Sequence, residues 1–257
     1  LVSFDALRDV SLQVRQGRSV AVVGPNGSGK STLLKLLAGI VAPDAGSVRI
    51  AGRVAGLLEL GAGFQLEFTG MENIFLQGAL LGLSRAEILE RLDDIVAFSG
   101  VARFIHTPMK RYSSGMAVRL GFAIAVHARP NVMLVDEVLA VGDAAFQKKC
   151  LRRIERFREE GGVVLLVSHV AEHIELVADE MLWLEGGTER ASGPAQDVLP
   201  EFIAASAAPR PENAQRVGFV RDDQRRMTAM VSVMGGGETH EGAARIERLA
   251  LLGGEDG

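Results

Sequence analysis

Near its N-terminus the chain reads Val20-Ala21-Val22-Val23-Gly24-Pro25-Asn26-Gly27-Ser28-Gly29-Lys30-Ser31-Thr32. The first four residues are apolar and mostly β-branched, which is typical of a buried strand. From residue 31 to residue 40 the apolar side chains, most of them leucines, recur at helical spacing, so the pattern predicts a helix there. The turn between them fits G-x-x-x-x-G-K-[ST], a pattern that is informative where a strand precedes it and a helix follows. Both neighbours are present in this sequence.

The residue types in this turn suit a bound anion. Glycine lets successive backbone N–H groups turn toward a phosphate, and the N-terminus of the following helix adds partial positive charge. Lys30 supplies a full charge at the β- and γ-phosphates, and the hydroxyl of Ser31 can ligate Mg²⁺. We therefore predict a nucleoside triphosphate site with contacts from the whole motif: Gly24, Pro25, Asn26, Gly27, Ser28, Gly29, Lys30, Ser31 and Thr32.

Two later apolar runs, 132–135 and 163–167, predict further buried strands, and polar residues follow each of them. We expect Asp136, after the first run, to hold Mg²⁺ directly or through water, and Glu137 to act as general base for an attacking water. His169 follows the second run, and ligands bind at the carboxyl ends of strands in open α/β sheets. We therefore expect His169 to contact the γ-phosphate rather than to be a purely structural histidine.

The composition excludes several classes of protein. Lysine and arginine number 28 and aspartate and glutamate 32, so the formal net charge is −4, which argues against a basic nucleic-acid-binding domain. The single cysteine, Cys150, rules out an internal disulfide and fits a reducing compartment. We expect it to be a small buried residue. No run approaches the roughly 18 apolar residues that a membrane-spanning helix requires.

Strands and helices alternate along the chain, which indicates an α/β protein with a parallel sheet covered on both faces. Ser84 opens a second helix, because Ser-Arg-Ala-Glu is a capping box that closes on Glu87. A third helical stretch lies within 112–128 and is cut off by Pro130. The composition changes near Ala204, where alanine, proline, charged residues and a triple glycine follow, as in a linker.

The segment Tyr112-Ser113-Ser114-Gly115-Met116 resembles the signature sequence of ABC-type ATPases, which usually reads Leu-Ser-Gly-Gly-Gln. Three of the five positions depart from that pattern. The two that match are Ser113 and Gly115, and the resemblance implies that they contact the γ-phosphate of ATP held by the other subunit. The physical logic is again a helix N-terminus directed at an anion.

Other residues match the same family in the same order along the chain. Gln65 looks like the family's glutamine between the phosphate loop and the helical subdomain, which reaches Mg²⁺ and the attacking water and senses the membrane partner. Asp143, in Ala140-Val141-Gly142-Asp143, matches the loop that crosses the dimer interface and approaches the nucleotide. His169 matches the family's switch histidine. The resemblance extends from Val10 to about Leu184.

The resemblance implies a fold class and a division into domains. The fold is expected to be an α/β P-loop NTPase of ABC type, with a mostly parallel sheet core, an antiparallel β part and an α-helical subdomain at about 66–128. This ATPase domain is expected to span residues 1–204, followed by a linker over 205–239. Residues 240–257 then read as the start of a truncated C-terminal carbohydrate-binding domain.

Several segments point to a subfamily. Residues 59–64 and 69–74 resemble the ATPases that export bacterial polysaccharides, namely O-antigen and teichoic acid exporters, and so do 112–116 and 136–143. Some of those exporters carry a C-terminal carbohydrate-binding β-sandwich, and residues 242–252 look like its first strand. The alternative for this last segment is a ragged tail.

The implied function is that of the ATP-binding and ATP-hydrolysing subunit of an ABC exporter, with ATP and Mg²⁺ as cofactors. Hydrolysis would be coupled to export of a cell-surface polysaccharide across the cytoplasmic membrane, so the polysaccharide would be handled only indirectly. Two copies would form a head-to-tail homodimer beside a membrane-spanning permease subunit. We expect a peripheral location on the cytoplasmic face of the bacterial inner membrane and no nucleic-acid partner.

Two other functions are considered. A non-transport ABC ATPase acting on the ribosome or on DNA would carry two cassettes or a long coiled-coil insertion, whereas this chain has one phosphate loop and no heptad run between Lys30 and Ser113. A binding module that has lost catalysis is the other alternative. The presence of Lys30, Asp136, Glu137 and His169 argues against it.

Overall fold

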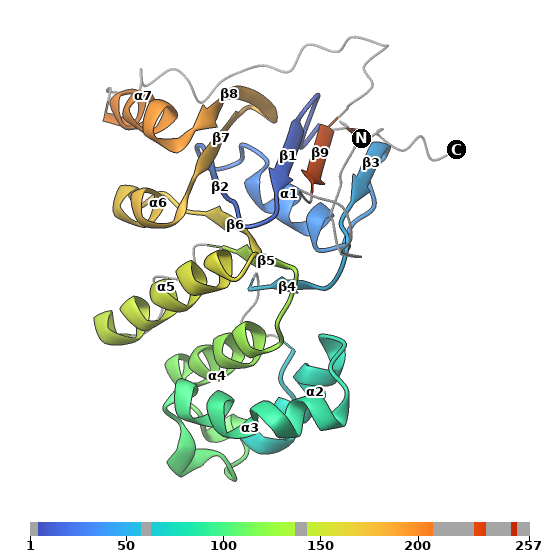
Figure 1. The fold of residues 1–257 in the computed structure, drawn as a ribbon, viewed down its shortest axis with the longest axis vertical. Coiled ribbons are helices and arrows are strands. Elements are labelled where there is room, and N and C mark those ends of the chain that lie inside the picture. The colour runs from blue at the N-terminus through green and yellow to red at the C-terminus, as the bar shows by residue number, and fades with distance from the viewer. Residues whose placement is uncertain (1–4, 58–62, 137–142, 208–228, 235–247, 251–257) are drawn as a thin grey trace.

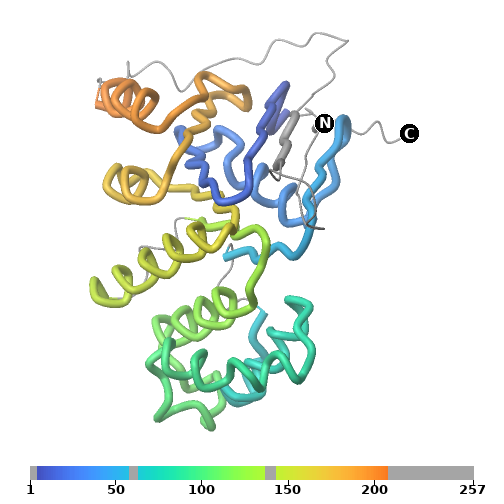
Figure 2. The backbone as a smooth tube through the Cα atoms, viewed as in Figure 1, coloured from blue at the N-terminus to red at the C-terminus, as the bar shows by residue number. Residues whose placement is uncertain are grey.

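The chain is built around a six-stranded sheet whose central strands are the apolar runs of the sequence (Figure 1). The computed structural model describes residues 5–57, 63–136, 143–207, 229–234 and 248–250, and Figure 2 traces the backbone. The strand order across the large sheet is β4-β5-β6-β2-β7-β8. These strands are β2 (Ser19–Val23), β4 (Val54–Gly56), β5 (Val132–Val135), β6 (Val163–Val167), β7 (Glu180–Glu185) and β8 (Thr188–Pro194).

All pairs in this sheet are parallel except the one at its edge, where β8 runs antiparallel to β7. Every residue of β2, β5 and β6 is buried. Because both faces of these strands are covered, their sequences are continuous apolar runs and do not alternate. The prediction of a mostly parallel sheet covered on both faces is confirmed.

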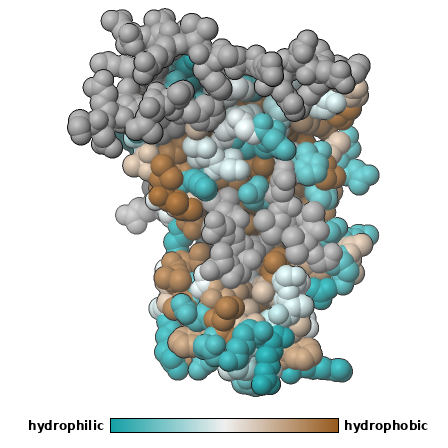
Figure 3. Space-filling model, turned by 180° about the vertical axis from the view of Figure 1, so that it is seen from behind, coloured by the Kyte–Doolittle hydropathy of each residue, from teal (hydrophilic) through white to brown (hydrophobic). Residues whose placement is uncertain are grey.

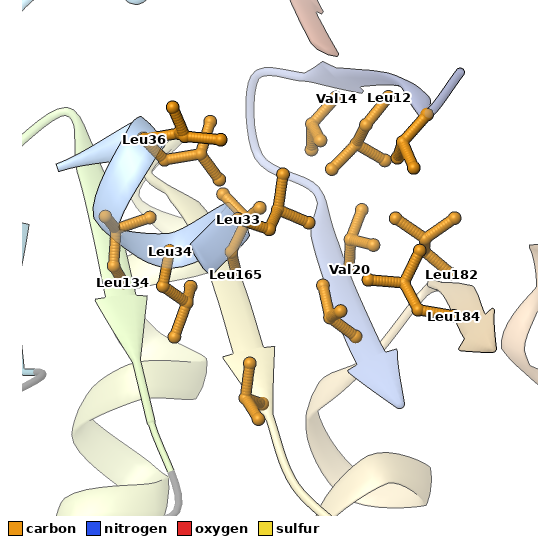
Figure 4. Close-up of a cluster of buried hydrophobic side chains, with 14 of the residues drawn as sticks. Leu12, Val14, Val20, Leu33, Leu34, Leu36, Leu134, Leu165, Leu182 and Leu184 are labelled. Atoms are coloured by element: carbon orange, nitrogen blue, oxygen red, sulfur yellow. The ribbon is translucent and has the colours of Figure 1, made fainter. Parts of the chain in front are cut away.

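One face of the large sheet is covered by α1 (Lys30–Leu37), which follows the glycine-rich turn. All four leucines of α1 are at most 2 % exposed. Figure 4 shows leucines of this helix among side chains from β2, β5, β6 and β7 on one side and from β1 (Ser11–Arg15) on the other. The helix ends three residues before the predicted residue 40, because Gly39 takes a positive φ of 70° that stops it.

A smaller sheet lies beyond α1 and pairs early strands with late ones. It contains β1, β3 (Ala45–Arg49), β9 (Ala229–Met234) and β10 (Arg248–Ala250). Strand β9 runs parallel to both β1 and β3, whereas β10 runs antiparallel to β3. The small sheet thus supplies the antiparallel pairing that was expected outside the parallel core. The expected division of the chain after residue 204 stays a prediction.

Three helices cover the opposite face of the large sheet: α5 (Ala144–Glu159), α6 (Ala171–Val177) and α7 (Ala195–Ala207) (Figure 1). Cys150 of α5 lies in the apolar cluster between this helix and the sheet, and burial raises the pKa of its thiol to about 12. The expectation that Cys150 is a small buried residue is therefore confirmed. Trp183 and Phe202 pack edge to face with ring centroids 5.4 Å apart and fasten α7 to β7.

A helical unit follows the edge strand β4 and occupies the lower end of the molecule in Figure 1. It contains α2 (Gly70–Leu80), α3 (Arg85–Ser99) and α4 (Ser114–His127), with 3₁₀ turns at Ala102–Phe104 and Met109–Arg111. Ser84 caps α3 through the predicted box with Glu87, and Gly100 ends the helix at a φ of 70°. The unit has its own apolar cluster, which includes Ile74, Ile95 and Leu120. Within the described residues, no helix is both long enough and apolar enough to cross a membrane.

Candidate nucleotide-binding site

The polar residues singled out in the sequence leave the large sheet at one edge. Strand β6 lies between β5 and β2, and Val22 pairs with Val167 while Val135 pairs with Leu166. Because the three strands are parallel and in this register, Gly24, Asp136 and Ser168 follow their carboxyl ends at nearly the same level. Neighbouring strands are about 4.8 Å apart. The sheet therefore brings the glycine-rich turn, Asp136 and His169 together as predicted.

Three glycines of the turn have left-handed backbone conformations, with φ of 144° at Gly24, 78° at Gly27 and 100° at Gly29. A Cβ at Gly24 would collide with the carbonyl oxygen of Leu184, and one at Gly29 would collide with the side chain of Leu7. At Gly27, by contrast, nothing described lies within 4 Å of such a Cβ. Packing therefore requires glycine at two positions, while the third leaves one side of the turn open to a ligand.

Lys30 reaches back across the turn from the first residue of α1. Its Nζ donates hydrogen bonds to the carbonyl oxygens of Gly24, at 2.8 Å, and Pro25, at 2.9 Å. The ammonium group is thus held against the turn, where an anion bound by the backbone N–H groups would meet it. This is the position that the sequence motif predicts for a lysine that binds β- and γ-phosphates.

Ser28 carries a buried polar atom that points to a ligand. The residue is 1 % exposed, and within the described residues its Oγ has no hydrogen-bond partner. A buried hydroxyl without a partner is costly in a protein interior, and such groups call for a specific explanation. A phosphate oxygen bound by the turn would supply the missing acceptor.

The oxygen donors at the site fit Mg²⁺. Ser31 is exposed at the start of α1, and the partly buried Asp136 follows β5. Hydroxyl and carboxylate oxygens are ligands that Mg²⁺ prefers, and the ion is commonly held by one or two protein oxygens together with phosphates and water. Within the described residues, no group of three His, Cys, Asp or Glu side chains could hold a metal alone. Ser31 and Asp136 would therefore hold Mg²⁺ jointly with a nucleotide.

His169 lies two residues beyond β6 with its side chain exposed. Ser168, just before it, is buried, and its Oγ accepts a hydrogen bond from the backbone N–H of Val170 at 3.1 Å. This turn carries His169 to the ligand-binding edge of the sheet. Glu137, together with residues 138–142, lies outside the described residues, so its role as general base stays a prediction.

Gln65 is exposed on the segment that enters the helical unit, and its backbone is fixed by a residue that the sequence analysis did not single out. The fully buried Asn73 accepts a hydrogen bond from the Gln65 N–H at 2.8 Å and donates to the Gln65 carbonyl at 3.0 Å. It also donates to the carbonyl oxygens of Phe68 and Thr69. The contacts of Gln65 with Mg²⁺ and with the attacking water stay predictions.

The signature segment begins α4. Ser113 is the N-cap, and its Oγ accepts a hydrogen bond from the Met116 N–H at 3.2 Å. Ser113 is exposed, and a Cβ at Gly115 would have its nearest neighbour 3.9 Å away. Packing within the chain therefore does not require glycine at position 115. A group from outside the chain that comes close to this helix N-terminus would require glycine there.

Asp143 is held within the chain by two different groups. One carboxylate oxygen accepts from the Phe146 N–H at 2.8 Å, which makes Asp143 the N-cap of α5, and the other lies 2.5 Å from the Arg119 guanidinium. The hydrogen bond from Phe146 and, more weakly, Arg119 lower the pKa of Asp143. The predicted approach of Asp143 to a nucleotide stays a prediction, and Arg119 is a second residue that the sequence analysis missed.

A glycine-rich turn between a central parallel strand and a helix, with an aspartate at the end of a nearby strand, defines a P-loop nucleotide-binding protein. The family model described as "ABC transporter" matches residues 7–140. The chain therefore belongs to the ABC transporter family of ATP-binding proteins, which confirms the resemblance found in the sequence.

Named relatives point in the same direction. The chain is 41 % identical over 256 residues to an O-antigen export system ATP-binding protein, RfbB, of Myxococcus xanthus, covering 96 % of this chain and 56 % of that protein. It is 43 % identical over 199 residues to a teichoic acids export ATP-binding protein, TagH, of Lactococcus lactis, covering 77 % of this chain and 42 % of that protein. The chain thus spans only about half the length of these relatives.

A solved structure supports the fold. The chain superposes on an ATP-binding subunit of an ABC transporter with a TM-score of 0.70 at 26 % sequence identity, covering 79 % of this chain and 89 % of that one. The predicted P-loop fold of ABC type, with a mostly parallel sheet and a helical unit, is therefore confirmed.

Proposed function

We propose that this chain is the ATP-binding and ATP-hydrolysing subunit of an ABC exporter that moves a cell-surface polysaccharide across the cytoplasmic membrane. The observation that carries the proposal is the convergence of Lys30, Asp136 and His169 at one edge of the sheet. The names of the relatives supply the cargo class, since they are export proteins for O-antigen and teichoic acids.

Different residues of the chain bind the phosphates, hold the metal ion and act on the attacking water. Lys30 and the backbone N–H groups of the turn bind the phosphates, and Ser28 donates its buried hydroxyl to them. Ser31 and Asp136 hold Mg²⁺, which when bound supplies positive charge to the phosphates. Glu137 takes a proton from the attacking water as general base, and His169 contacts the γ-phosphate.

A second copy of the chain completes each site. Ser113 is exposed and Gly115 is partly buried at the N-terminus of α4, which is a helix end suited to an anion. In a head-to-tail homodimer this helix end faces the γ-phosphate of the ATP bound by the partner subunit. Binding of ATP then closes the dimer, and hydrolysis releases it.

The helical unit carries the surface that we assign to a membrane-spanning permease. Leu66 and Phe68, which follow Gln65 in the chain, are 60 % and 46 % exposed. Phe104 is 49 % exposed, and its neighbour Ile105 accepts a hydrogen bond from the Met71 N–H at the start of α2. The N–H of Met109 donates to the Phe68 carbonyl and ties this segment to the unit. Figure 3 shows hydrophobic side chains interrupting the hydrophilic surface over the helical unit. Docking here places the subunit on the cytoplasmic face of the inner membrane.

Hydrolysis by the purified chain tests the proposal. Glu137→Gln keeps the groups that bind ATP and removes the general base, so we expect unchanged ATP affinity, a kcat lowered by about 100-fold or more, and an ATP-trapped dimer on size exclusion. Glu159→Gln, which changes an exposed glutamate of α5, serves as the matched control and should hydrolyse ATP like the parent. Parent-like turnover in Glu137→Gln would contradict the role of Glu137.

A further inference from the structure

Arg119 joins α4, which begins with the signature segment, to α5, whose N-cap Asp143 is expected from the family resemblance to approach the same nucleotide. It lies on α4, six positions after Ser113, and its guanidinium is 2.5 Å from the Asp143 carboxylate. The same guanidinium lies over the ring of Phe146, with its carbon 5.0 Å from the ring centroid. Arg119 thus contacts both the N-cap and the third residue of α5.

These contacts fix the orientation of the Asp143 carboxylate. One oxygen is used by the helix cap through the Phe146 N–H, and the other is used by Arg119. The cap alone would hold one oxygen and leave the carboxylate able to turn about it. With both oxygens engaged on different sides, rotation of the group breaks one hydrogen bond or the other.

The surroundings of Phe146 make this junction stiff. Phe146 is 6 % exposed and packs edge to face against Phe122 of α4 at 6.1 Å between centroids. Arg119 and Phe122 therefore hold the first turn of α5 from the same helix, one through charge and one through apolar contact. Both contacts join α4 to the helix whose N-cap is Asp143.

The ion pair itself adds little to folding. The side chains of Arg119 and Asp143 are 29 % and 62 % exposed, and pairs at such positions contribute little to stability. What the pair determines is the direction of the Asp143 carboxylate at the start of α5. A role in alignment and a role in stability therefore predict different results.

We propose that Arg119 is a positioning residue that keeps Asp143 and the N-terminus of α4 aligned, so that both meet the partner subunit's nucleotide together. This inference rests on the proposed function. It concerns the catalytic step and leaves untouched the chain's own phosphate-binding turn. Loss of Arg119 therefore lowers turnover in the dimer and spares the affinity of each subunit for ATP.

The test is a double-mutant cycle on ATP hydrolysis by the purified chain. Arg119→Ala and Asp143→Asn are each expected to lower kcat about tenfold, since misplacing a reacting constellation by a fraction of an ångström has effects of this size or larger. Asp143→Asn keeps an oxygen for the helix cap. The double variant should be no slower than either single variant. Arg119→Lys should recover part of the loss, because it keeps the positive charge but not the planar guanidinium with its paired N–H donors.

Two further readouts separate alignment from stability. The affinity for ATP should stay at the parent value, and the unfolding midpoint should shift by less than about 2 °C. Arg156→Ala is the matched control, because it removes another arginine–carboxylate pair of α5, with Glu160 at 3.0 Å, and should leave kcat unchanged.

Other results would overturn the inference. If the parent hydrolyses ATP and Arg119→Ala does so equally fast, or if the effects of Arg119→Ala and Asp143→Asn simply multiply, Arg119 does not position Asp143 for the reaction. A parent chain that does not hydrolyse ATP would instead contradict the proposed function, and the inference would fall with it.

Discussion

Ser28 and Lys30 occupy the same turn but are prepared for a ligand in opposite ways. The ammonium of Lys30 is held by the carbonyl oxygens of Gly24 and Pro25. The Ser28 hydroxyl is buried, and the described residues offer it no partner. The Lys30 ammonium therefore has hydrogen-bond acceptors even when no anion is bound, and it does not destabilise the empty turn. The buried Ser28 hydroxyl has lost its water without gaining a partner, and a bound phosphate would remove this desolvation cost.

This difference predicts an unusual result for Ser28→Ala. Removing an unsatisfied buried hydroxyl should leave the unfolding midpoint of the ligand-free chain unchanged or slightly raised. The increase in midpoint produced by ATP should become smaller, because ligand stabilisation follows affinity. Thermal unfolding with and without ATP measures both quantities.

Ser19 offers the matched control for this experiment. It is also a buried serine, but its hydroxyl donates to the Val177 carbonyl and accepts from the Asp179 N–H. Ser19→Ala should therefore lower the midpoint of the ligand-free chain and leave the ATP-induced increase intact. An unchanged ATP-induced increase in Ser28→Ala would show that Ser28 does not bind the nucleotide.

Helix α3 shows how a local motif stabilises one element. Ser84 accepts from the Glu87 N–H, and the Glu87 carboxylate accepts from the Ser84 N–H at 2.8 Å. The backbone N–H and the hydroxyl of Ser84 lower the pKa of Glu87. A carboxyl group with a lowered pKa stabilises the fold above its unfolded-state pKa, and this contribution is lost as the pH falls through the folded-state value.

Ser84→Ala should destabilise the protein by about 1 kcal/mol at pH 7, as is usual for the loss of a serine N-cap. The difference from the parent should shrink as the pH falls through the lowered pKa of Glu87, because its carboxylate then takes up a proton. Urea unfolding at several pH values measures the difference. A pH-independent difference would mean that the Ser84 hydroxyl does not contribute to the lowered pKa of Glu87.

Elements with a local or periodic pattern were predictable from the sequence. The capping box at Ser84 and the buried runs of β2, β5 and β6 fall where they were predicted. Helix α7 was not predicted; it continues through Pro200, a residue that normally ends helices. Its packing on the sheet through residues such as Val198 and Leu199 outweighs the local signal.

The contacts that organise the site were less predictable. Asn73 holds the backbone of Gln65 by hydrogen bonds, and Arg119 of α4 pairs with Asp143 at the start of α5. Such pairs join residues far apart in the sequence or link a side chain to the backbone, so no periodic pattern in the sequence predicts them. The loop motif itself was predictable, because its chemistry requires fixed residue types at fixed spacing.

At the scale of the whole molecule, the proposed function gives one chain two separate surfaces that face a phosphate. The turn around Lys30 lies at the edge of the large sheet, whereas Ser113 begins a helix of the helical unit. The proposed head-to-tail dimer assigns the two surfaces to different nucleotides. This assignment can be tested in mixed dimers, in which one subunit has a defective turn and the other has a defective helix end.

Mixing Lys30→Ala with Ser113→Ala should restore activity that neither variant has alone. In a mixed dimer, the intact turn of the Ser113→Ala subunit meets the intact helix end of the Lys30→Ala subunit, so one of two sites is complete. Random pairing of equal amounts should then give about a quarter of the parent's rate of ATP hydrolysis. Activity no higher than the mean of the two variants would count against the head-to-tail dimer.

The central claim is that ATP hydrolysis at Lys30 and Glu137 drives polysaccharide export, and surface polysaccharide in the native host measures this most directly. With Lys30→Ala placed in the chromosomal gene, we predict that polymer disappears from the cell surface and accumulates inside the cell. Lys35→Ala, an exposed lysine of the same helix, should leave the surface unchanged. A normal polysaccharide coat on Lys30→Ala cells, with the variant protein present at the parent level, would contradict the account.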